Sequence, residues 1–188
     1  MTDGEPLHDD REPLLIEQVG EARYLAHLPD LDYLNLLAPH RQGEVAMVIQ
    51  RTPGWVLLQT KAHYPPGTFR IPTGTVRKGE AVERTLLREL KEEANLTPGS
   101  QRELFMLDYD VEGGRKRFST IAYLVERPEG ELMPVDTSER IIAWREAQVS
   151  ELANVARELR RLEPPRQGWG LFRSAVHQLL AQVLSEGD

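Results

Sequence analysis

The stretch that decides the fold is GTVRKGEAVERTLLRELKEEANL, residues 74–96. Its first part carries glycines at positions 74 and 79, which give the backbone unusual conformational freedom. Residues 81–94 then contain no glycine or proline and are rich in good helix formers. This pattern predicts a loop that leads directly into a helix over 81–94.

Three carboxylates cluster on this expected helix. Glu89, Glu92 and Glu93 lie three or four residues apart or adjacent, so their side chains are neighbours in space. On a helical wheel, Glu93 projects only about 20° from Leu86, which belongs to the apolar stripe. An unpaired carboxylate at the edge of a buried stripe is costly, so a cation should face it. Hard ions such as Mg²⁺ or Mn²⁺ suit clustered carboxylates; the alternative is a solvated helix face whose glutamates pair with lysine or arginine.

These glutamates belong to a longer pattern of spaced residues that covers the whole stretch. Its positions are Gly74, Glu80, Arg88, Glu89, Leu90, Glu92, Glu93 and Leu96. These residues resemble the Nudix box, G-x5-E-x7-R-E-U-x-E-E-x-G-U with U aliphatic, which is the signature of the Nudix hydrolases. Asn95 stands where the family has its last glycine, and Thr73 stands where many relatives have another. Asparagine tolerates the left-handed conformation that commonly ends a helix, so the helix end should be preserved.

The resemblance implies metal-dependent hydrolysis of a nucleoside diphosphate linked to another moiety, in which a water attacks one phosphorus. By motif position, Glu89, Glu92 and Glu93 are expected to bind Mg²⁺ or Mn²⁺, and one of them also to serve as general base. The carbonyl of Gly74 is expected to complete the metal shell.

Further residues are implied around this set. Arg88 and Glu80 would form an ion pair that orients the carboxylates. Family members often recruit another carboxylate from outside the box, and Glu139, in a polar loop, is a candidate. Arg70, just before the loop, could contact a phosphate. Lesser candidates are the carboxylates of Glu112 and Glu131 and, for stacking on a base, the rings of Tyr109, Tyr123 and Trp144, although strand aromatics more often pack in the core.

The rest of the chain predicts the α/β class, as an α+β mixed sheet packed against helices; the resemblance implies a Nudix-type α/β/α sandwich. Expected strands are 44–50, 55–60, 69–72, 103–112, 116–127 and 139–145, and further helices are 147–162 and 169–184. Turn residues predict two hairpins, one joining 44–50 to 55–60 and one joining 103–112 to 116–127.

The chain is expected to hold one domain with an appendage. Residues 1–13 are predicted to be a disordered tail because they are charged and poor in apolar side chains. Residues 14–43 are predicted to be an N-terminal extension, with short helical or irregular structure over 28–40, that packs on the domain or on a dimer partner. Residues 44–188 would be the Nudix hydrolase domain. A homodimer is therefore one alternative.

Composition narrows the function classes. The 188 residues carry a formal net charge of −7, which argues against a nucleic-acid partner gripped through its phosphates. There is no cysteine, so disulfides, thiolate metal sites and a thiol nucleophile are excluded. No apolar run approaches the roughly 20 residues that span a membrane. With a polar, acidic N-terminus unlike a signal peptide, the sequence predicts a soluble, cytoplasmic protein.

The box predicts the chemistry but not the small-molecule nucleotide substrate. The N-terminal extension weakly favours ADP-ribose or a nucleotide sugar. One alternative is a (d)NTP or dinucleoside polyphosphate hydrolase. Another is a non-catalytic Nudix-fold sensor that binds a nucleotide, which the complete glutamate set disfavours. A DNA-binding regulator or a purely structural acidic helix are the remaining alternatives.

Overall fold

The computed structural model describes residues 12–29, 43–111 and 118–185. The strands are β1 (Ile16–Gly20), β2 (Arg23–Leu28), β3 (Gly43–Gln50), β4 (Trp55–Lys61), β5 (Thr73–Thr75), β6 (Ser100–Val111), β7 (Ser119–Glu126) and β8 (Ile141–Gln148). The helices are α2 (Val82–Ala94), α3 (Leu152–Arg160) and α4 (Gln167–Ser185), with short 3-10 turns η1 (Thr137–Glu139) and η2 (Val149–Glu151). Among these described residues, no helix is long and apolar enough to cross a membrane.

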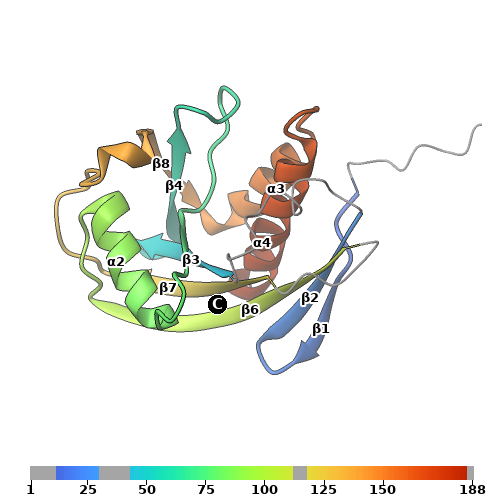
Figure 1. Ribbon diagram of the computed structural model, residues 1–188, viewed down its shortest axis with the longest axis horizontal. Helices are drawn as coiled ribbons and strands as arrows, with labels where there is room; N and C mark the ends of the chain where they lie inside the picture. The colour runs from blue at the N-terminus through green and yellow to red at the C-terminus, as the bar shows by residue number, and fades with distance from the viewer. Residues whose placement is uncertain (1–11, 30–42, 112–117, 186–188) are drawn as a thin grey trace, which may run out of the picture.

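The strands form a mixed sheet, which confirms the predicted fold class. Six strands pair in the order β1-β2-β6-β7-β3-β5, and a separate ribbon pairs β4 with β8. The β2–β6 and β3–β7 pairs are parallel, and the other pairs are antiparallel. Helix α2 lies on one side of the strands, and α3 and α4 lie on the other (Figure 1).

Strand β3 is the centre of the molecule because both of its faces are buried. Val45, Met47 and Ile49 belong to the apolar cluster that includes residues of α2. Ala46 and Val48 belong to the other cluster, which includes residues of α3 and α4. Successive side chains of a strand point to opposite faces, so one apolar run supplies two cores.

The hairpin predicted between 44–50 and 55–60 is wrong. Both strands exist, but β3 pairs with β5 and β7, so neither of its edges is free. Strand β4 instead turns away and pairs with β8 in antiparallel register, with Leu58 opposite Arg145. The Pro-Gly turn between the runs does not join them in one ladder. In contrast, the predicted pairing of 103–112 with 116–127 is confirmed by β6 and β7.

Three other predictions need correction. The strand expected over 69–72 is absent, because Arg70 forms only an isolated bridge there and β5 spans Thr73–Thr75. The helix expected over 147–162 starts late: strand β8 continues to Gln148, and α3 begins only at Leu152, after η2. The N-terminal extension contains two strands that were not predicted, and β2 joins the main sheet beside β6. The predictions for the tail and for 28–40 fall almost entirely on residues outside the described ranges, and the division of the chain at residue 43 stays a prediction.

Helix α2 ends as the sequence predicts. Asn95 adopts the left-handed conformation, with φ 58° and ψ 29°, and its N–H donates to the carbonyls near the end of the helix. Its side chain also donates to the carbonyl of Glu131 at 3.1 Å. The substitution of asparagine for glycine therefore keeps the helix end and adds a contact.

The apolar stripe of α2 gives a direct test of this packing. Leu86 is fully buried, whereas its neighbour Leu87 is 44% exposed. We expect Leu86→Ala to lower the free energy of unfolding by about 2–5 kcal/mol, because it leaves a cavity between α2 and the sheet. Leu87→Ala should change it by less than about 0.5 kcal/mol. Urea unfolding followed by circular dichroism measures both; equal effects would contradict this orientation of α2.

Candidate active site

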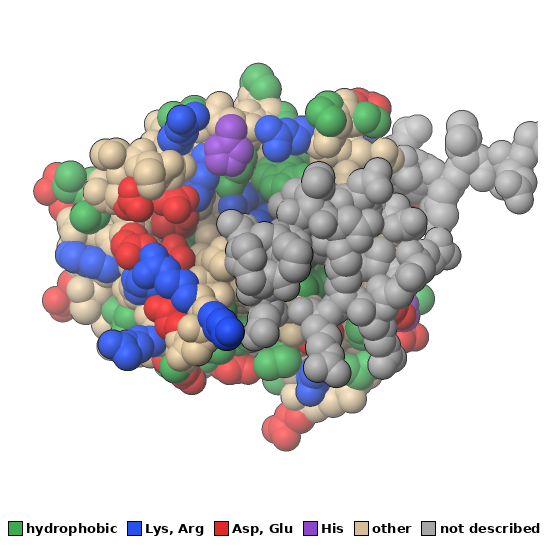
Figure 2. Space-filling model, in the orientation of Figure 1, with side chains coloured by type: hydrophobic (Ala, Val, Ile, Leu, Met, Phe, Trp, Pro, Cys, Tyr) green, Lys and Arg blue, Asp and Glu red, His purple; other side chains and the backbone are tan. Residues whose placement is uncertain are grey.

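The predicted carboxylates lie on the edge of α2 that meets the sheet. Glu93 is 1% exposed and Glu89 is 7% exposed, so both are buried, while Glu92 is more accessible, with 35% of its side chain exposed. Figure 2 shows acidic side chains gathered over α2, with basic side chains among them and a hollow beside them. The expected position of Glu93 at the buried edge of the helix is therefore what the structure shows.

Gly74 makes room for Glu89. The glycine lies in β5, opposite Val45 of β3. A Cβ atom added at Gly74 would lie 1.9 Å from Cγ of Glu89, closer than two carbon atoms can approach. Burial at this contact raises the pKa of Glu89 to about 7, even though Arg88 favours the charged form. The side chain of Glu89 therefore occupies the space that a side chain at Gly74 would need.

Arg88 connects the loop to the carboxylates. Its guanidinium binds both oxygens of Glu80, at 2.8 and 2.9 Å, and the carbonyl of Thr75 at 3.1 Å. Its remaining nitrogen donates to Glu89 at 2.7 Å and to Glu92 at 3.0 Å. The hydrogen bonds from Arg88 lower the pKa of Glu80 to about 2. The expected Arg88–Glu80 ion pair is therefore present, and it reaches two of the three clustered glutamates.

Glu93 takes its partners from β4. The ammonium of Lys61 lies 2.7 Å from Oε1 of Glu93, and the amide of Gln59 donates to Oε2 at 3.0 Å. Burial raises the pKa of Glu93, against the attraction of Lys61. Burial also opposes the charge of Lys61, but Glu93 and Glu139 outweigh it, so the pKa of Lys61 is raised. Lys61 therefore opposes the rise in the pKa of Glu93 that burial causes, and Glu93 in turn stabilises the charge of Lys61.

Glu139, the last residue of η1, reaches the same cluster from just before β8. Its carboxylate contacts the ammonium of Lys61. The backbone fixes this approach, because the N–H of Ala62 donates to the carbonyl of Arg140 at 2.9 Å. The segment before it docks on α2, where the N–H groups of Val135 and Asp136 donate to the carbonyl of Glu92 at 2.9 and 3.0 Å. Glu139, a candidate from the sequence, is thus brought to Glu93 through Lys61.

Arg70 is buried rather than exposed on its segment. It donates to the carbonyl of Ile71 at 2.7 Å and to the hydroxyl of Thr73 at 3.1 Å, and its guanidinium lies 5.1 Å from the ring centre of Tyr64. Within the described part of the chain, it forms no ion pair with a carboxylate. Its positive charge still favours the ionised form of Glu93 and so acts against the rise in that pKa.

Helix α4 holds the same segment from the opposite face. The N–H of Ile71 donates to Nε2 of His177 at 3.0 Å, so that nitrogen carries no proton and Nδ1 donates to the carbonyl of Arg173 at 2.8 Å. Burial lowers the pKa of His177 to about 4, which keeps the ring neutral. Arg173 pairs with Glu44 at 2.6 Å. The path into the box loop is therefore fixed by polar contacts on both faces of the sheet.

The remaining candidates do not join this cluster. Tyr109 and Tyr123 are buried in opposite apolar clusters, and Trp144 packs at the edge of the cluster under α2. Glu131 is exposed, and its backbone carbonyl is what meets Asn95. Glu112 lies outside the described residues. The aromatic side chains thus serve the core, as is usual for strand positions.

The donor set fits a hard divalent cation in its chemistry. Carboxylate oxygens are the ligands that Mg²⁺ and Mn²⁺ prefer, and Oε1 of the buried Gln59 has no hydrogen-bond partner among the described residues. As the side chains stand, no group of three or more His, Asp or Glu in the described ranges is arranged to hold a metal. Arg88 binds Oε1 of Glu89 and Oε2 of Glu92, and Lys61 binds Oε1 of Glu93. A metal that bound any of these three oxygens would compete with one of these cations.

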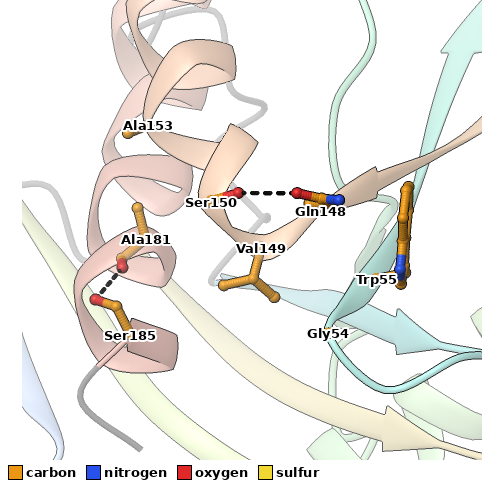
Figure 3. Close-up of a pocket in the computed structure, with 8 residues that line it drawn as sticks. All are labelled: Gly54, Trp55, Gln148, Val149, Ser150, Ala153, Ala181 and Ser185. Atoms are coloured by element: carbon orange, nitrogen blue, oxygen red, sulfur yellow. Dashed lines mark hydrogen bonds between the residues drawn. The ribbon is translucent and has the colours of Figure 1, made fainter. Parts of the chain in front are cut away.

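A second hollow lies at the other end of β4. It is lined by Gly54, Trp55, Gln148, Val149, Ser150, Ala153, Ala181 and Ser185 (Figure 3). Trp55 starts β4 and Lys61 ends it, so this hollow is roughly 20 Å from the carboxylates along the strand. No charged side chain lines it. It is therefore separate from the cluster on α2.

Comparison with known proteins shows which family carries this stretch of sequence. A family model described as the NUDIX domain matches residues 40–166, which include the whole 74–96 stretch. The chain belongs to the Nudix family. No curated protein matches it significantly by sequence.

Solved structures share the Nudix fold at low sequence identity. A study of MutT from Aliivibrio salmonicida and Vibrio cholerae supplies one, with a TM-score of 0.54 and 21% identity over 77% of this chain and 97% of that one. The E. coli ORF135 protein gives 0.52 and 20% over 77% and 88%. A protein described as an ADP compounds hydrolase gives 0.51 and 16% over 77% and 73%. At these identities the likeness concerns the fold alone.

The sequence reasoning missed Lys61 and Gln59 as members of this Nudix site. The signal was present at the end of β4, where the polar residues Gln59 and Lys61 follow an apolar run. A buried lysine and glutamine at the end of an apolar strand need polar partners. Their partner, Glu93, could not be identified without knowing that β4 crosses α2.

The contact between Gly74 and Glu89 predicts a substitution effect. Gly74→Ala should displace Glu89 or part β5 from α2, and it should lower the free energy of unfolding by about 1–3 kcal/mol, the usual cost of overpacking. Gly20→Ala is the matched control, because a Cβ there meets its nearest neighbour at an ordinary 3.6 Å. Thermal unfolding of the two variants measures the difference. Equal melting temperatures would show that Glu89 does not occupy this space.

Proposed function

We propose that this Nudix protein is a hydrolase that cleaves the pyrophosphate bond of a nucleoside diphosphate linked to another moiety, with Mg²⁺ or Mn²⁺ as cofactor. The observation that carries the proposal is the burial of Glu89 and Glu93 beside Glu92 on one edge of α2. A helix that served only as a solvated surface would not hold two carboxylates against the sheet at the cost of their desolvation.

In this proposal the box residues divide the tasks of metal binding, proton transfer and positioning. Glu89, Glu92 and Glu93 would hold the metal, with the carbonyl of Gly74, and one of these glutamates would accept the proton of the attacking water. A bound divalent ion supplies neutralisation of the diphosphate and a lowered pKa of the water. Arg88 and Glu80 are positioning residues. Their contacts fix the rotamers of Glu89 and Glu92, which supports the assignment.

Two residues outside the box are included as supporting groups. Arg70 is a buried cation without a carboxylate partner in the described ranges, which suits a contact with a substrate phosphate. Glu139 lies on the far side of Lys61 from Glu93, where it adds a carboxylate from outside the box to the site. For the substrate we favour ADP-ribose or a nucleotide sugar. The (d)NTPs and dinucleoside polyphosphates are the second candidates within the same chemistry.

The proposal is tested by incubating the protein with Mg²⁺ and a panel of nucleoside diphosphate sugars, ADP-ribose, dNTPs and dinucleoside polyphosphates, with products identified by mass spectrometry. Glu93→Gln should lower the rate on the best substrate by about 100-fold or more, because it removes a charged ligand while keeping the shape. Glu83→Gln, on the exposed first turn of α2, is the matched control and should keep the rate. Tight binding of one compound with no turnover of any would favour the sensor alternative.

We further propose a homodimer formed through the N-terminal hairpin. Strand β1 is at the edge of the sheet, and Leu15 and Val19 beside and within it are 61% and 53% exposed. An exposed edge with apolar side chains is a template for pairing with a second copy.

Light scattering coupled to size-exclusion chromatography tests this dimer. The parent protein should elute with twice the chain mass, and Val19→Lys should shift the population toward the monomer by placing a charge on the edge strand. Gln101→Lys, which places the same charge at an exposed position outside β1, is the control. A monomeric parent protein at high concentration would rule out the proposal.

A further inference from the structure

Lys61 is a buried cation that no motif accounts for. It is the last residue of β4, and only 6% of its side chain is exposed. Its ammonium lies between two carboxylates, that of Glu93 at 2.7 Å and that of Glu139. Glu93 is almost fully buried, whereas 36% of the side chain of Glu139 is exposed. The ammonium therefore bridges Glu93, the inner acceptor, and Glu139, the outer acceptor.

The inner acceptor has no free oxygen for a metal ion while Lys61 is in place. Lys61 occupies Oε1 of Glu93, and Gln59 occupies Oε2. In contrast, Oε1 of Gln59 is buried and has no partner among the described residues. The carboxylate of Glu93 is therefore paired on both oxygens, while the neighbouring Oε1 of Gln59 is unpaired. A hard cation next to both groups would take the place of one partner of Glu93 and give the Gln59 oxygen a partner.

Lys61 is easier to displace than Arg88. Arg88 is fixed by both oxygens of Glu80 and by the carbonyl of Thr75, so it keeps its place even if Glu89 turns away. Lys61 donates only to Glu93 and Glu139 among the described residues. A flexible ammonium that already touches a second, more exposed acceptor can leave the first without losing its charge partner.

We propose that Lys61 is an exchangeable counter-ion of Glu93, which the divalent metal displaces toward Glu139. This inference rests on the proposed metal-dependent function. Metal binding would then free Oε1 of Glu93, and Glu139 would keep the ammonium of Lys61 paired, so that Lys61 is a positioning residue. Glu139 acts in this scheme through Lys61 and not as a metal ligand.

The position of Glu139 supports this two-site arrangement. It follows Asp136, whose N–H donates to the carbonyl of Glu92 at 3.0 Å, and it precedes Arg140, whose carbonyl accepts from Ala62 at 2.9 Å. The outer acceptor is thus attached to α2 on one side and to the end of β4 on the other.

The test measures Mn²⁺ affinity without any substrate, from the electron paramagnetic resonance signal of free Mn²⁺ at one fixed pH. Lys61→Met should bind Mn²⁺ about tenfold more tightly than the parent protein, the scale of one charge-assisted hydrogen bond that no longer competes. Lys91→Met is the control for charge alone, because it removes the same charge from an exposed position on α2. Lys61→Gln serves as a second neutral variant if Lys61→Met does not fold.

Glu139→Gln should change the Mn²⁺ affinity in the opposite direction from Lys61→Met. The ammonium loses its outer acceptor and stays with Glu93, so Mn²⁺ should bind several-fold more weakly than in the parent protein. In the Lys61→Met background, the same substitution should have no further effect, because it acts only through the lysine. This double-mutant cycle separates coupling through Lys61 from direct ligation.

Each outcome decides the proposal. Equal Mn²⁺ affinities for Lys61→Met and Lys91→Met would overturn it, and so would a Glu139→Gln effect of the same size with and without Lys61, which would make Glu139 a ligand. In both cases the metal-dependent function would stand, because the parent protein binds Mn²⁺. A parent protein that binds no Mn²⁺ would instead contradict the proposed function itself.

Discussion

The closeness of α2 to the sheet at Gly74 is the constraint on which the rest of the site depends. A helix carrying three clustered glutamates would normally keep them in water, where their mutual repulsion is screened. Here the missing Cβ of Gly74 lets Glu89 enter the contact between β5 and α2. Once the carboxylates are buried, each needs a cation, and the protein supplies Arg88 and Lys61 from two different elements. The apolar stripe of Leu86 and Leu90 can then pack without leaving a charge unpaired.

The box loop is held by two helices on opposite faces of the sheet. From α2, Arg88 reaches the carbonyl of Thr75. From α4, the neutral ring of His177 accepts the N–H of Ile71. The backbone between these anchors carries Thr73 and Gly74, and it has little freedom to change its path. This explains how a loop with flexible residues can present its groups in one geometry, as a site that acts on a small ligand requires.

Local patterns predicted α2 and its contents well, because that information lies within one helix. The wheel position of Glu93 follows from helical spacing, whereas the Arg88–Glu80 pair and the left-handed Asn95 were expected from the resemblance to the Nudix box. Contacts between distant segments were not predictable in this way. The pairing of β4 with β8 instead of β3 depends on which strand edges are already occupied. Lys61 was missed for the same reason, since its partner lies 32 residues away on another element.

The segment that precedes η1 has a consequence for how this fold tolerates change. Met133, Val135 and Asp136 donate to the last carbonyls of α2, and the chain then continues into β8, which pairs with β4 and so with Lys61. Helix, segment and ribbon thus form a closed ring of contacts around Glu93. Surface connections normally accept added residues at little cost. In this ring, an extra residue between 133 and 140 would have to be absorbed by the ribbon or by the helix. Length variation is therefore more readily accommodated elsewhere on the surface than in this connection.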